Sequence, residues 1–321
     1  MASILRWRMA SRARGPLTAP VPAVDVDPDG RGVVVVVNVN SGDSSATLLG
    51  GPDLPERVRA ALPAAEIVEP GPDDDLAAAI DDAARRCDVL AVAGGDGTVN
   101  LGATAALRHD RPLLVLPGGT FDNFASTLGI SSVEAAVLAY REGLVGAVDV
   151  GTVGDRLFLN TASVGAYPRL FDHRERLRSR MGKWAAFAVA AWTALREADP
   201  TEVVINGRRM PVWWAFVGNG RHHTRALIPS RRTRLDDGLL DIRLLRARKR
   251  FSRVRVTLDV LLGHWGIGAT YAQWRAATFT VSAASGTLRL ACDGETFDAG
   301  STATFGKITG RLRVFHARPR R

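Results

Sequence analysis

The sequence has few residues that could cross-link the chain or anchor it in a membrane. Its 321 residues include only two cysteines, Cys87 and Cys292, too few for a disulfide framework, so a reducing cytoplasm is expected. The longest apolar helical stretch, residues 184–195, is shorter than the roughly 20 residues that span a bilayer. The first thirty residues lack the apolar core of a signal peptide. We therefore expect a cytoplasmic protein with a flexible tail at 1–30 and two buried, inert thiols.

Lysine is also scarce. The three lysines are Lys183, Lys249 and Lys307, so arginine carries almost all of the formal net charge of +9. Arginines are densest between Arg221 and Arg255. Such a surface attracts polyanions, either the anionic face of a membrane or nucleic acid, although a solvated surface without a partner is an equally weighted alternative. No zinc-finger, helix-turn-helix or aromatic RNA-binding signature accompanies the charge, so nucleic acid is not expected as a partner.

The first 150 residues show a regular alternation of predicted strands and helices. Residues 33–37 (VVVVV) are a continuous β-branched run, typical of a strand buried on both faces of a parallel sheet. Further strands are predicted at 66–68, 88–93 and 112–116, and helices at 54–62, 75–86 and 98–107. This alternation predicts a doubly wound α/β domain over residues 31–150.

After about Asp149 the pattern changes to short alternating or aromatic-rich segments separated by turn residues. Strands are predicted at 156–160, 202–205, 212–217, 239–243, 277–281 and 287–290. Helical inserts are predicted at 174–196 and 253–264. We therefore expect a second, mostly antiparallel β domain over residues 151–305, and a C-terminal segment, 306–321, that returns to the first domain.

Three loops follow strands of the α/β domain, at 38–42, 94–100 and 117–123. Ligands of open α/β sheets bind beyond the carboxyl ends of the strands, where amides at helix starts point outward. Glycines let the backbone approach anionic oxygens closely, and Thr98 and Thr120 are placed to cap a helix and donate to a phosphate. One such loop is often only a tight connection, but two loops with Gly-Thr in one domain predict phosphate binding.

The loops match neither the Walker phosphate loop nor the dinucleotide-binding fingerprint. No lysine lies near them in the sequence, so backbone amides and a metal are expected to neutralise the phosphates. Asp96 would repel a phosphate unless a cation intervened. In the second domain, residues 235–239 (LDDGL) and 293–295 (DGE) place acids beside glycine turns. Each turn alone is more often hairpin structure than catalysis, but beside phosphate loops a catalytic role is favoured.

Six motifs, in family order, resemble the lipid kinases built on the diacylglycerol kinase catalytic domain, relatives of sphingosine kinases and, more remotely, of NAD kinases and phosphofructokinases. The motifs are GGDGTVN at 94–100, PGGTFDNFA at 117–125, FLNTASVGAY at 158–167, VGNG at 217–220, LDDGLLDIRLL at 235–245 and DGE at 293–295. The resemblance runs from about residue 32 to the C-terminus. It implies ATP-dependent phosphorylation of a lipid hydroxyl, with diacylglycerol, which would give phosphatidic acid, as the first candidate.

The resemblance also implies roles for individual residues. The implied ATP site comprises Asn38, Asn40, Ser41, Gly42, Gly94, Gly95, Asp96, Gly97, Thr98, Asn100 and Thr120. Glu295 corresponds to the general base that takes the proton from the lipid hydroxyl, and a catalytic Mg2+ is expected to travel with ATP near Asp96. A second Mg2+ is implied at Asp237, with the main-chain carbonyls of Arg234 and Leu239. Phosphoryl transfer needs positioning and charge stabilisation more than covalent chemistry, so this equipment is sufficient.

Three positions depart from the usual family pattern. Val39 stands where proline is common, Glu69 or Pro70 where a nucleotide-contacting threonine is frequent, and Phe121-Asp122 where a small residue and asparagine are usual. The first is a mild change, and the nucleotide contact is not carried over to the second. The third could alter the nucleotide or acceptor pocket.

The lipid-kinase interpretation predicts peripheral association with a membrane, where the protein would meet its lipid substrate and anionic lipid headgroups. Trp184, Phe187 and Trp192 could line an apolar acceptor site, or they could pack in a core. The acceptor could also be a sphingoid base, ceramide or another lipid alcohol. An NAD kinase is disfavoured because its Asn-x-Gly-x-Leu-Gly-Phe pattern is absent. A catalytically silent nucleotide- or lipid-binding protein, and a homodimer, both stay open.

Overall fold

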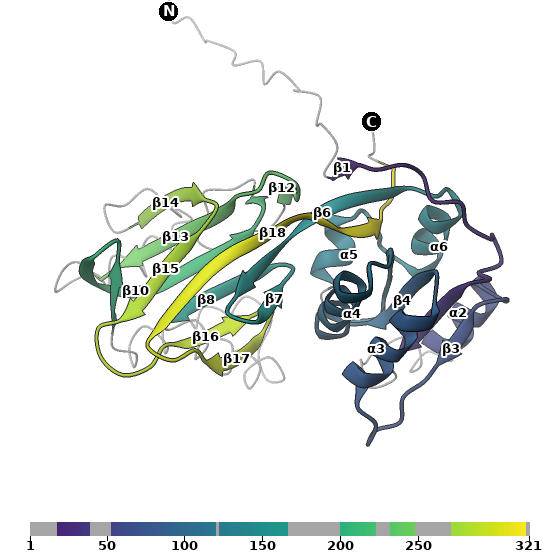
Figure 1. Ribbon diagram of the computed structural model, residues 1–321, viewed down its shortest axis with the longest axis horizontal. Helices are drawn as coiled ribbons and strands as arrows, with labels where there is room; N and C mark the ends of the chain where they lie inside the picture. The colour runs from purple at the N-terminus through teal and green to yellow at the C-terminus, as the bar shows by residue number, and fades with distance from the viewer. Residues whose placement is uncertain are drawn as a thin grey trace, which may run out of the picture.

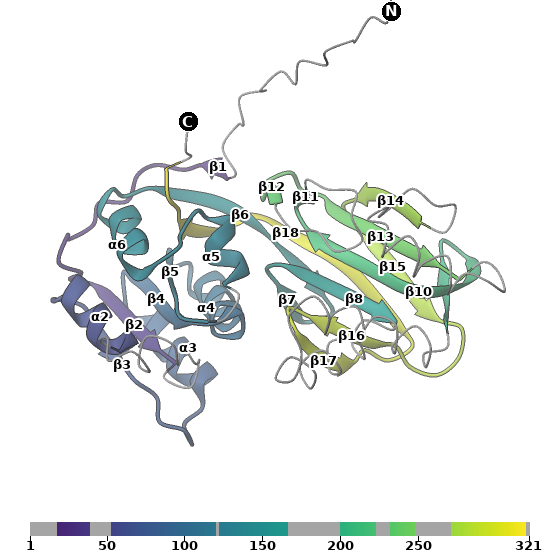
Figure 2. The same cartoon turned by 180° about the vertical axis from the view of Figure 1, so that it is seen from behind.

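The structure is a computed structural model that describes residues 18–38, 53–119, 122–165, 200–222, 232–247 and 271–318. Figures 1 and 2 show two bodies, one built from helices around a short parallel sheet and the other built almost entirely from strands. Two long strands, β6 and β18, run from one body into the other. The predicted fold class, an α/β domain followed by a mostly antiparallel β domain, is confirmed.

The first domain is organised around four parallel strands. In spatial order these are β3 (Glu66–Val68), β2 (Val33–Val37), β4 (Val89–Gly94) and β5 (Leu113–Pro117). Every residue of β2 is at most 4% exposed, because helices cover the sheet on both faces. The carboxyl ends of β2, β4 and β5 therefore lie together at one edge, where the three predicted loops begin.

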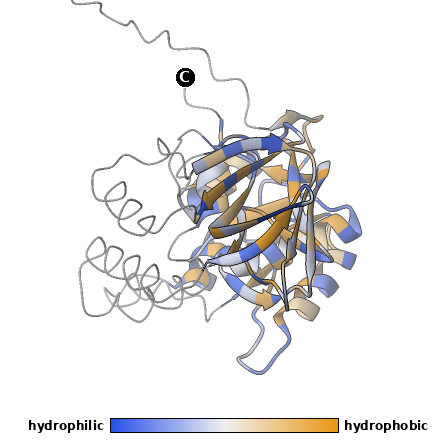
Figure 3. Cartoon of the chain, turned by 90° about the vertical axis from the view of Figure 1, so that its left-hand side faces the viewer, coloured by the Kyte–Doolittle hydropathy of each residue, from blue (hydrophilic) through white to orange (hydrophobic). Residues whose placement is uncertain are grey.

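Three of the five helices described in this domain begin with a side-chain cap. The five helices are α2 (Leu54–Ala61), α3 (Leu76–Arg86), α4 (Asp96–His109), α5 (Asn123–Thr127) and α6 (Val133–Arg141). Asp53 forms a capping box with Glu56, and Asp75 and Ser132 cap α3 and α6 with their side chains. Helix α3 packs on α4, and α2 packs on α6. In Figure 3 the second domain faces the viewer, and the helices that show behind it carry both hydrophilic and hydrophobic residues, as expected for helices buried on one side.

The second domain is antiparallel. Its main strands are β8 (Thr161–Gly165), β9 (Thr201–Ile205), β10 (Arg208–Asn219), β13 (Leu240–Arg246), β14 (Tyr271–Ala276), β15 (Phe279–Ala283), β16 (Arg289–Cys292) and β17 (Glu295–Asp298). Short strands β11 (Arg221–His222) and β12 (Arg232–Arg234) form a separate pair. Alternate residues of the main strands, such as Val203, Ala215 and Ile242, form a second apolar core, as the period of two along a strand requires.

Strands β6 (Val145–Val153) and β18 (Thr302–Phe315) join the two domains. They pair with each other along most of their length. The start of β18 pairs with β15 in the second domain, whereas Val314 pairs in parallel with Leu113 of β5 in the first. Strands β1 (Ala19–Pro20) and β7 (Arg156–Phe158) add to the edges of β6. The chain therefore ends its last strand within the first domain.

The two predicted buried thiols are confirmed. Cys87 and Cys292 are free and buried, and burial raises the pKa of the Cys87 thiol to about 11 and also raises that of Cys292, so both thiols stay protonated.

The predicted helical inserts at 174–196 and 253–264 lie outside the described residues, as do Trp184, Phe187 and Trp192. Within the residues described, no helix has the length and apolar character needed to cross a membrane.

Candidate active site

The loops after β4 and β5 are in direct backbone contact. An ideal Cβ on Gly119 would lie 2.5 Å from the Cα atom of Gly95, and one on Gly118 would lie 3.3 Å from the Cα atom of Gly94. The amide of Gly118 donates to the carbonyl oxygen of Gly94 at 3.3 Å. The two Gly-Gly pairs therefore have a packing requirement, because any side chain at Gly119 would force the loops apart.

Asn38, at the end of β2, is bound to the first turn of α4. Its side-chain amide donates to the hydroxyl of Thr98 at 2.9 Å, and its main-chain amide donates to the carbonyl of Ala93 at 2.9 Å. Thr98 is 4% exposed, and its hydroxyl would lie 2.7 Å from a Cβ on Gly94. The structure thus brings Asn38, Gly94 and Thr98 of the predicted ATP site together, with the Thr98 hydroxyl turned toward Asn38.

The N-terminus of α4 is suited to bind an anion. Its N-cap, Gly95, has no side chain that could satisfy the first amides of the helix, and these amides have no partner within the helix. Gly97, in the first turn, is exposed. Amides at a helix start and the positive end of the helix dipole together favour a phosphate at this position.

Asp96 links three parts of the site. Its carboxylate accepts from the side-chain and main-chain amides of Asn123 at 2.9 and 3.3 Å, and from the main-chain amide of Phe124 at 3.3 Å. It also accepts from the side-chain amide of Asn160, in the second domain, at 3.4 Å. Asp96 therefore caps the N-terminus of α5 and connects it to the second domain.

The unusual Phe121-Asp122-Asn123 sequence is explained in part by these contacts. Asp122 has a left-handed backbone, with φ of 43°, and does not cap α5. Its side chain instead accepts from the amide of Gly119 at 3.0 Å, while Asn123 donates to Asp96. Asp122 thus binds the second glycine loop at Gly119, and Asn123 binds the first loop at Asp96.

The Asp-Gly-Glu motif forms a tight hairpin between β16 and β17. Asp293 and Gly294 have φ of 46° and 100°, and the flanking residues Cys292 and Glu295 are paired, so both turn residues have the positive φ typical of two-residue hairpins. Glu295 is the first residue of β17, and its side chain is 75% exposed. A Cβ on Gly97 would lie 3.9 Å from the Oε1 atom of Glu295. The predicted base therefore faces the N-terminus of α4 from the other domain.

Asp293 fixes the position of this hairpin. Its carboxylate accepts from the main-chain amides of Leu159, Asn160 and Thr161 at 2.6, 2.9 and 2.8 Å. It also accepts from the side-chain amide of Asn100, on α4, at 3.0 Å. Burial raises the pKa of Asp293, and the amide donors oppose that rise. Asn100, predicted in the ATP site, thus uses its side-chain nitrogen to join the domains.

Arg232 is a residue of this site that sequence reasoning missed. Its guanidinium donates to the hydroxyl of Thr127 on α5 at 2.9 Å and to the side-chain oxygen of Asn160 at 2.6 Å, and it also donates to the carbonyl of Leu159. Burial lowers the pKa of Arg232 to about 10, against the opposing charges of Asp293 and Asp96. In the sequence it is one of many arginines in a run expected at the surface, and nothing there marks it as a contact between domains.

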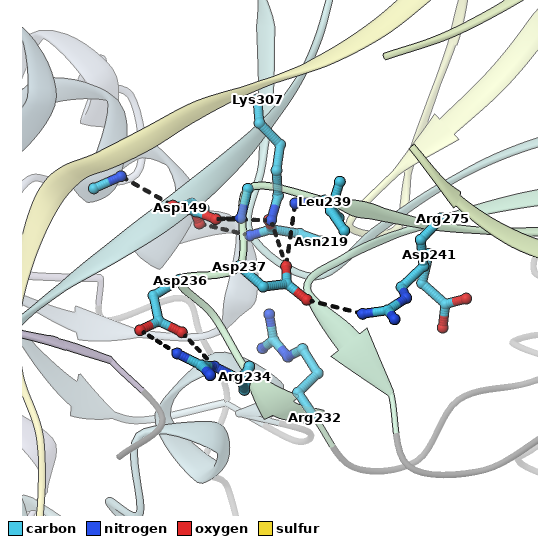
Figure 4. A network of polar contacts seen from close by, with 12 residues as sticks. Asp149, Asn219, Arg232, Arg234, Asp236, Asp237, Leu239, Asp241, Arg275 and Lys307 are labelled. Atoms are coloured by element: carbon cyan, nitrogen blue, oxygen red, sulfur yellow. Dashed lines mark hydrogen bonds and ion pairs between the residues drawn. The ribbon is translucent and has the colours of Figure 1, made fainter. Parts of the chain in front are cut away.

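The predicted metal-binding residues are arranged differently from a magnesium site (Figure 4). Oδ1 of Asp237 lies 3.6 Å from the Nζ atom of Lys307, and Oδ2 lies 3.6 Å from a guanidinium nitrogen of Arg275. The guanidinium of Arg234 pairs with Asp236 at 2.9 Å, and the amide of Leu239 donates to Asp237 at 3.1 Å. Mg2+ requires near-octahedral oxygen ligands at about 2.0–2.1 Å. A cation of the protein thus lies beside each oxygen of Asp237, although its buried Oδ2 atom accepts no hydrogen bond within the described residues, and this arrangement disfavours a divalent ion on the side chain.

Part of the predicted site cannot be compared in this way. Asn40, Ser41, Gly42 and Thr120 lie outside the described residues, as do Val39 and Phe121. The ATP-binding and catalytic roles of the other residues stay predictions. The structure brings together residues from two strand ends of the first domain and one hairpin of the second: Asn38, Gly94, Gly95, Asp96, Gly97, Thr98 and Glu295.

Comparisons with known proteins show the family to which the chain belongs. Residues 32–153 match the family model described as the diacylglycerol kinase catalytic domain. The chain is 30% identical, over 232 residues, to a protein of Pseudomonas aeruginosa named as a probable lipid kinase YegS-like, covering 70% of this chain and 75% of that relative. It is 29% identical over 201 residues to the diacylglycerol kinase of Bacillus subtilis, covering 59% of this chain and 65% of that one.

Solved structures show the same fold. The crystal structure of a diacylglycerol kinase from Bacillus anthracis superposes with a TM-score of 0.61 at 18% identity, and covers 89% of this chain and 97% of that chain. At this identity the likeness is one of fold. The sequence matches carry the assignment further: the chain belongs to the diacylglycerol kinase catalytic-domain family of lipid kinases.

Proposed function

We propose that the protein transfers the γ-phosphate of ATP to the hydroxyl of a membrane lipid, with diacylglycerol as the first candidate and phosphatidic acid as its product. The observation that carries this proposal is the position of Glu295. It is an exposed carboxylate that the β16–β17 hairpin holds opposite the uncapped N-terminus of α4, 3.9 Å from where a Cβ on Gly97 would lie. A proton acceptor and an anion-binding helix start therefore face each other across the two domains.

The donor would be held mainly by backbone amides. The paired loops at Gly94-Gly95 and Gly118-Gly119 place glycines, which have no side chains, beside the first turn of α4. Asn38 and the buried Thr98 keep the strand end and the helix start at a fixed spacing. Such a site costs little reorganisation when charge develops on the transferred phosphoryl group.

Asp96 is suited to hold the Mg2+ that accompanies ATP. Its Oδ1 atom accepts only two long hydrogen bonds among those described, at 3.3 and 3.4 Å, so this oxygen retains capacity for a further ligand. When bound, Mg2+ would neutralise charge on the β- and γ-phosphates. Asp96 itself orients α5 and, through Asn160, the loop that Asp293 also binds.

Glu295 would act as the general base. Its side chain is in solvent contact, so it can meet a hydroxyl presented at a membrane surface, and the Arg156 guanidinium 4.0 Å away keeps an opposite charge beside it. The Asp293 contacts to residues 159–161 fix the hairpin, and this limits the movement of Glu295. The base would accept the proton as the lipid oxygen attacks the phosphorus.

Two features support a lipid as the acceptor. The relatives in the comparisons are named as lipid kinases or diacylglycerol kinases, and the positive net charge of +9 favours an anionic surface. We therefore propose a cytoplasmic protein that associates peripherally with membranes. A sphingoid base, ceramide or another lipid alcohol is the alternative acceptor within the same chemistry.

The test is a labelling assay with a matched pair of variants. Purified protein is incubated with Mg2+, γ-labelled ATP and a total lipid extract, beside Glu295→Ala and a control, Glu202→Ala, which removes an exposed carboxylate elsewhere in the second domain. We expect a labelled lipid from the wild type and the control, and a rate lower by about 10²–10⁴-fold from Glu295→Ala. Mass spectrometry of the product identifies the acceptor.

Two results would contradict the proposal. Absence of any labelled lipid would contradict the lipid-kinase activity. The alternative of a catalytically silent nucleotide-binding protein would then be tested by measuring ATP binding. Equal labelling by Glu295→Ala would leave the activity but remove the assigned base. A parallel reaction with NAD in place of lipid separates the NAD kinase alternative.

A further inference from the structure

Among the described residues, one lysine is buried at the junction between the two domains. Lys307 lies on β18, just before the irregularity in its pairing with β6 between Ile308 and Leu312, and its side chain is 2% exposed. Lysine is almost never fully buried without a partner, because an ammonium loses its hydration there. The partners of Lys307 therefore explain why it can occupy this position.

The first partner is Asp149 on β6, whose side chain is also 2% exposed. Its carboxylate lies 3.0 Å from the Nζ atom of Lys307 and accepts from the main-chain amides of Gly238 and Gly310 at 2.8 and 2.9 Å. The main-chain amide of Asp149 donates to the carbonyl of Leu235 at 2.7 Å. Asp149 thus ties the 235–238 turn and the β18 irregularity to β6.

The second partner is Asp237, whose side chain is 13% exposed. Oδ1 of Asp237 lies 3.6 Å from the Nζ atom of Lys307, so the ammonium lies between this carboxylate and that of Asp149. Oδ2 of Asp237 faces Arg275 of β14 at 3.6 Å. Figure 4 shows Lys307 reaching from β18 toward both carboxylates.

The charges of this junction are already balanced. Two carboxylates, Asp149 and Asp237, face two cations, Lys307 and Arg275, so the described group is neutral. A divalent ion on either oxygen of Asp237 would share that oxygen with a cation of the protein. Burial makes such repulsion stronger than it is in water.

We propose that Lys307 is the resident cation of this junction, in the place where the resemblance to lipid kinases implies a second magnesium ion. Its ammonium holds Asp149 and Asp237 together and makes the folded state independent of a divalent metal at Asp237. The stability of the junction should therefore be the same with and without a chelator, and it should not depend on the concentration of free Mg2+. This proposal is separate from the phosphoryl-transfer proposal, and neither unfolding nor metal binding depends on activity.

The first experiment uses the wild-type protein and Asp237→Asn. Both are stripped with EDTA, and the unfolding temperature is measured with and without MgCl2 in the absence of nucleotide. Binding of Mn2+, which takes the same oxygen ligands, is followed by electron paramagnetic resonance. We expect that stripping does not lower the unfolding temperature of the wild type. We also expect the wild type and Asp237→Asn to bind the same amount of Mn2+.

The second experiment creates a requirement for a metal. Lys307→Met removes the cation with little change in length and leaves two carboxylates without it, so we expect the unfolding temperature to fall by about 10 °C. Added Mg2+ or Mn2+ should recover part of this fall. The matched control, Lys307→Arg, keeps a positive charge and should show no metal-dependent shift.

The outcomes separate cleanly. A wild-type unfolding temperature that falls on stripping, returns with Mg2+ and loses this response in Asp237→Asn would overturn the proposal. So would stoichiometric Mn2+ bound to the wild type through Asp237. Should Lys307→Met fail to fold, the wild-type and Asp237→Asn measurements decide alone, because both keep the lysine.

Discussion

At the scale of single residues, the glycines of the two phosphate loops are not equivalent. A Cβ on Gly119 would lie 2.5 Å from the Cα atom of Gly95, a distance that backbone cannot relieve by rotating a side chain. A Cβ on Gly95 would lie 3.6 Å from the Cα atom of Gly119, which is ordinary van der Waals contact. Of these two glycines, Gly119 is therefore required for packing and Gly95 is not.

This difference gives a matched pair of variants. Gly119→Ala should destabilise the protein by about 1–3 kcal/mol, because the loops must separate to admit the methyl group. Gly95→Ala should keep the wild-type unfolding temperature. Thermal unfolding of the two variants side by side makes the comparison, and similar losses in both would show that the close approach of the loops is not as described.

Sequence motifs predicted site residues that lie close together in the sequence. They did not predict residues that stand apart from any motif. Gly94 to Thr98 and Glu295 belong to recognisable patterns, and the structure places them face to face. Lys307 and Asp149 belong to no pattern, and each gains its role from a partner more than eighty residues away. Long-range charge pairing of this kind leaves no periodic signal, so no property of the neighbouring sequence could have indicated it.

At the scale of elements, strands buried on both faces were the easiest to predict. The run at Val33–Val37 and the apolar segments at β4 and β5 were found because their composition alone demands burial. Strand β18 was missed, since Gly306 and Gly310 interrupt Thr302–Phe315 and weaken its local strand preference. Pairing with β6, β15 and β5 overrides that preference. Tertiary contact, and not propensity, makes this strand.

The end of β18 should therefore matter to the first domain as much as to its own strand. Phe315 is fully buried, and its ring centroid lies 5.4 Å from that of Tyr140 on α6. We expect Phe315→Ala to cost about 3–5 kcal/mol of unfolding free energy, measured by denaturant unfolding. Arg318→Ala is the control, because its side chain is 72% exposed and pairs only with Glu142 in the described contacts; its loss should be about 0–1 kcal/mol.

At the scale of the whole molecule, the two domains meet through polar contacts beside the proposed reaction site. Asn100 of the first domain donates to Asp293 of the second, and Asn160 of the second donates to Asp96 of the first. Arg232 contacts both sides, with Thr127 on α5 and Asn160 in the second domain. Because Glu295 and α4 belong to different domains, these contacts set the distance between the proposed base and the proposed phosphate site.

Removing the Arg232 contact should therefore reduce catalysis more than it reduces stability. In Arg232→Gln the shorter amide cannot reach Thr127 and Asn160 together, and a small change in domain spacing is enough to misplace a proton acceptor. We expect kcat to fall by about tenfold or more, equivalent to about 1.4 kcal/mol, while KM for ATP changes little, because the glycine loops are intact. Arg289→Gln, an exposed arginine of β16 paired with Asp298, should leave both constants unchanged. If Arg232→Gln raised only the KM for ATP, Arg232 would be a nucleotide contact and not a residue that positions the two domains.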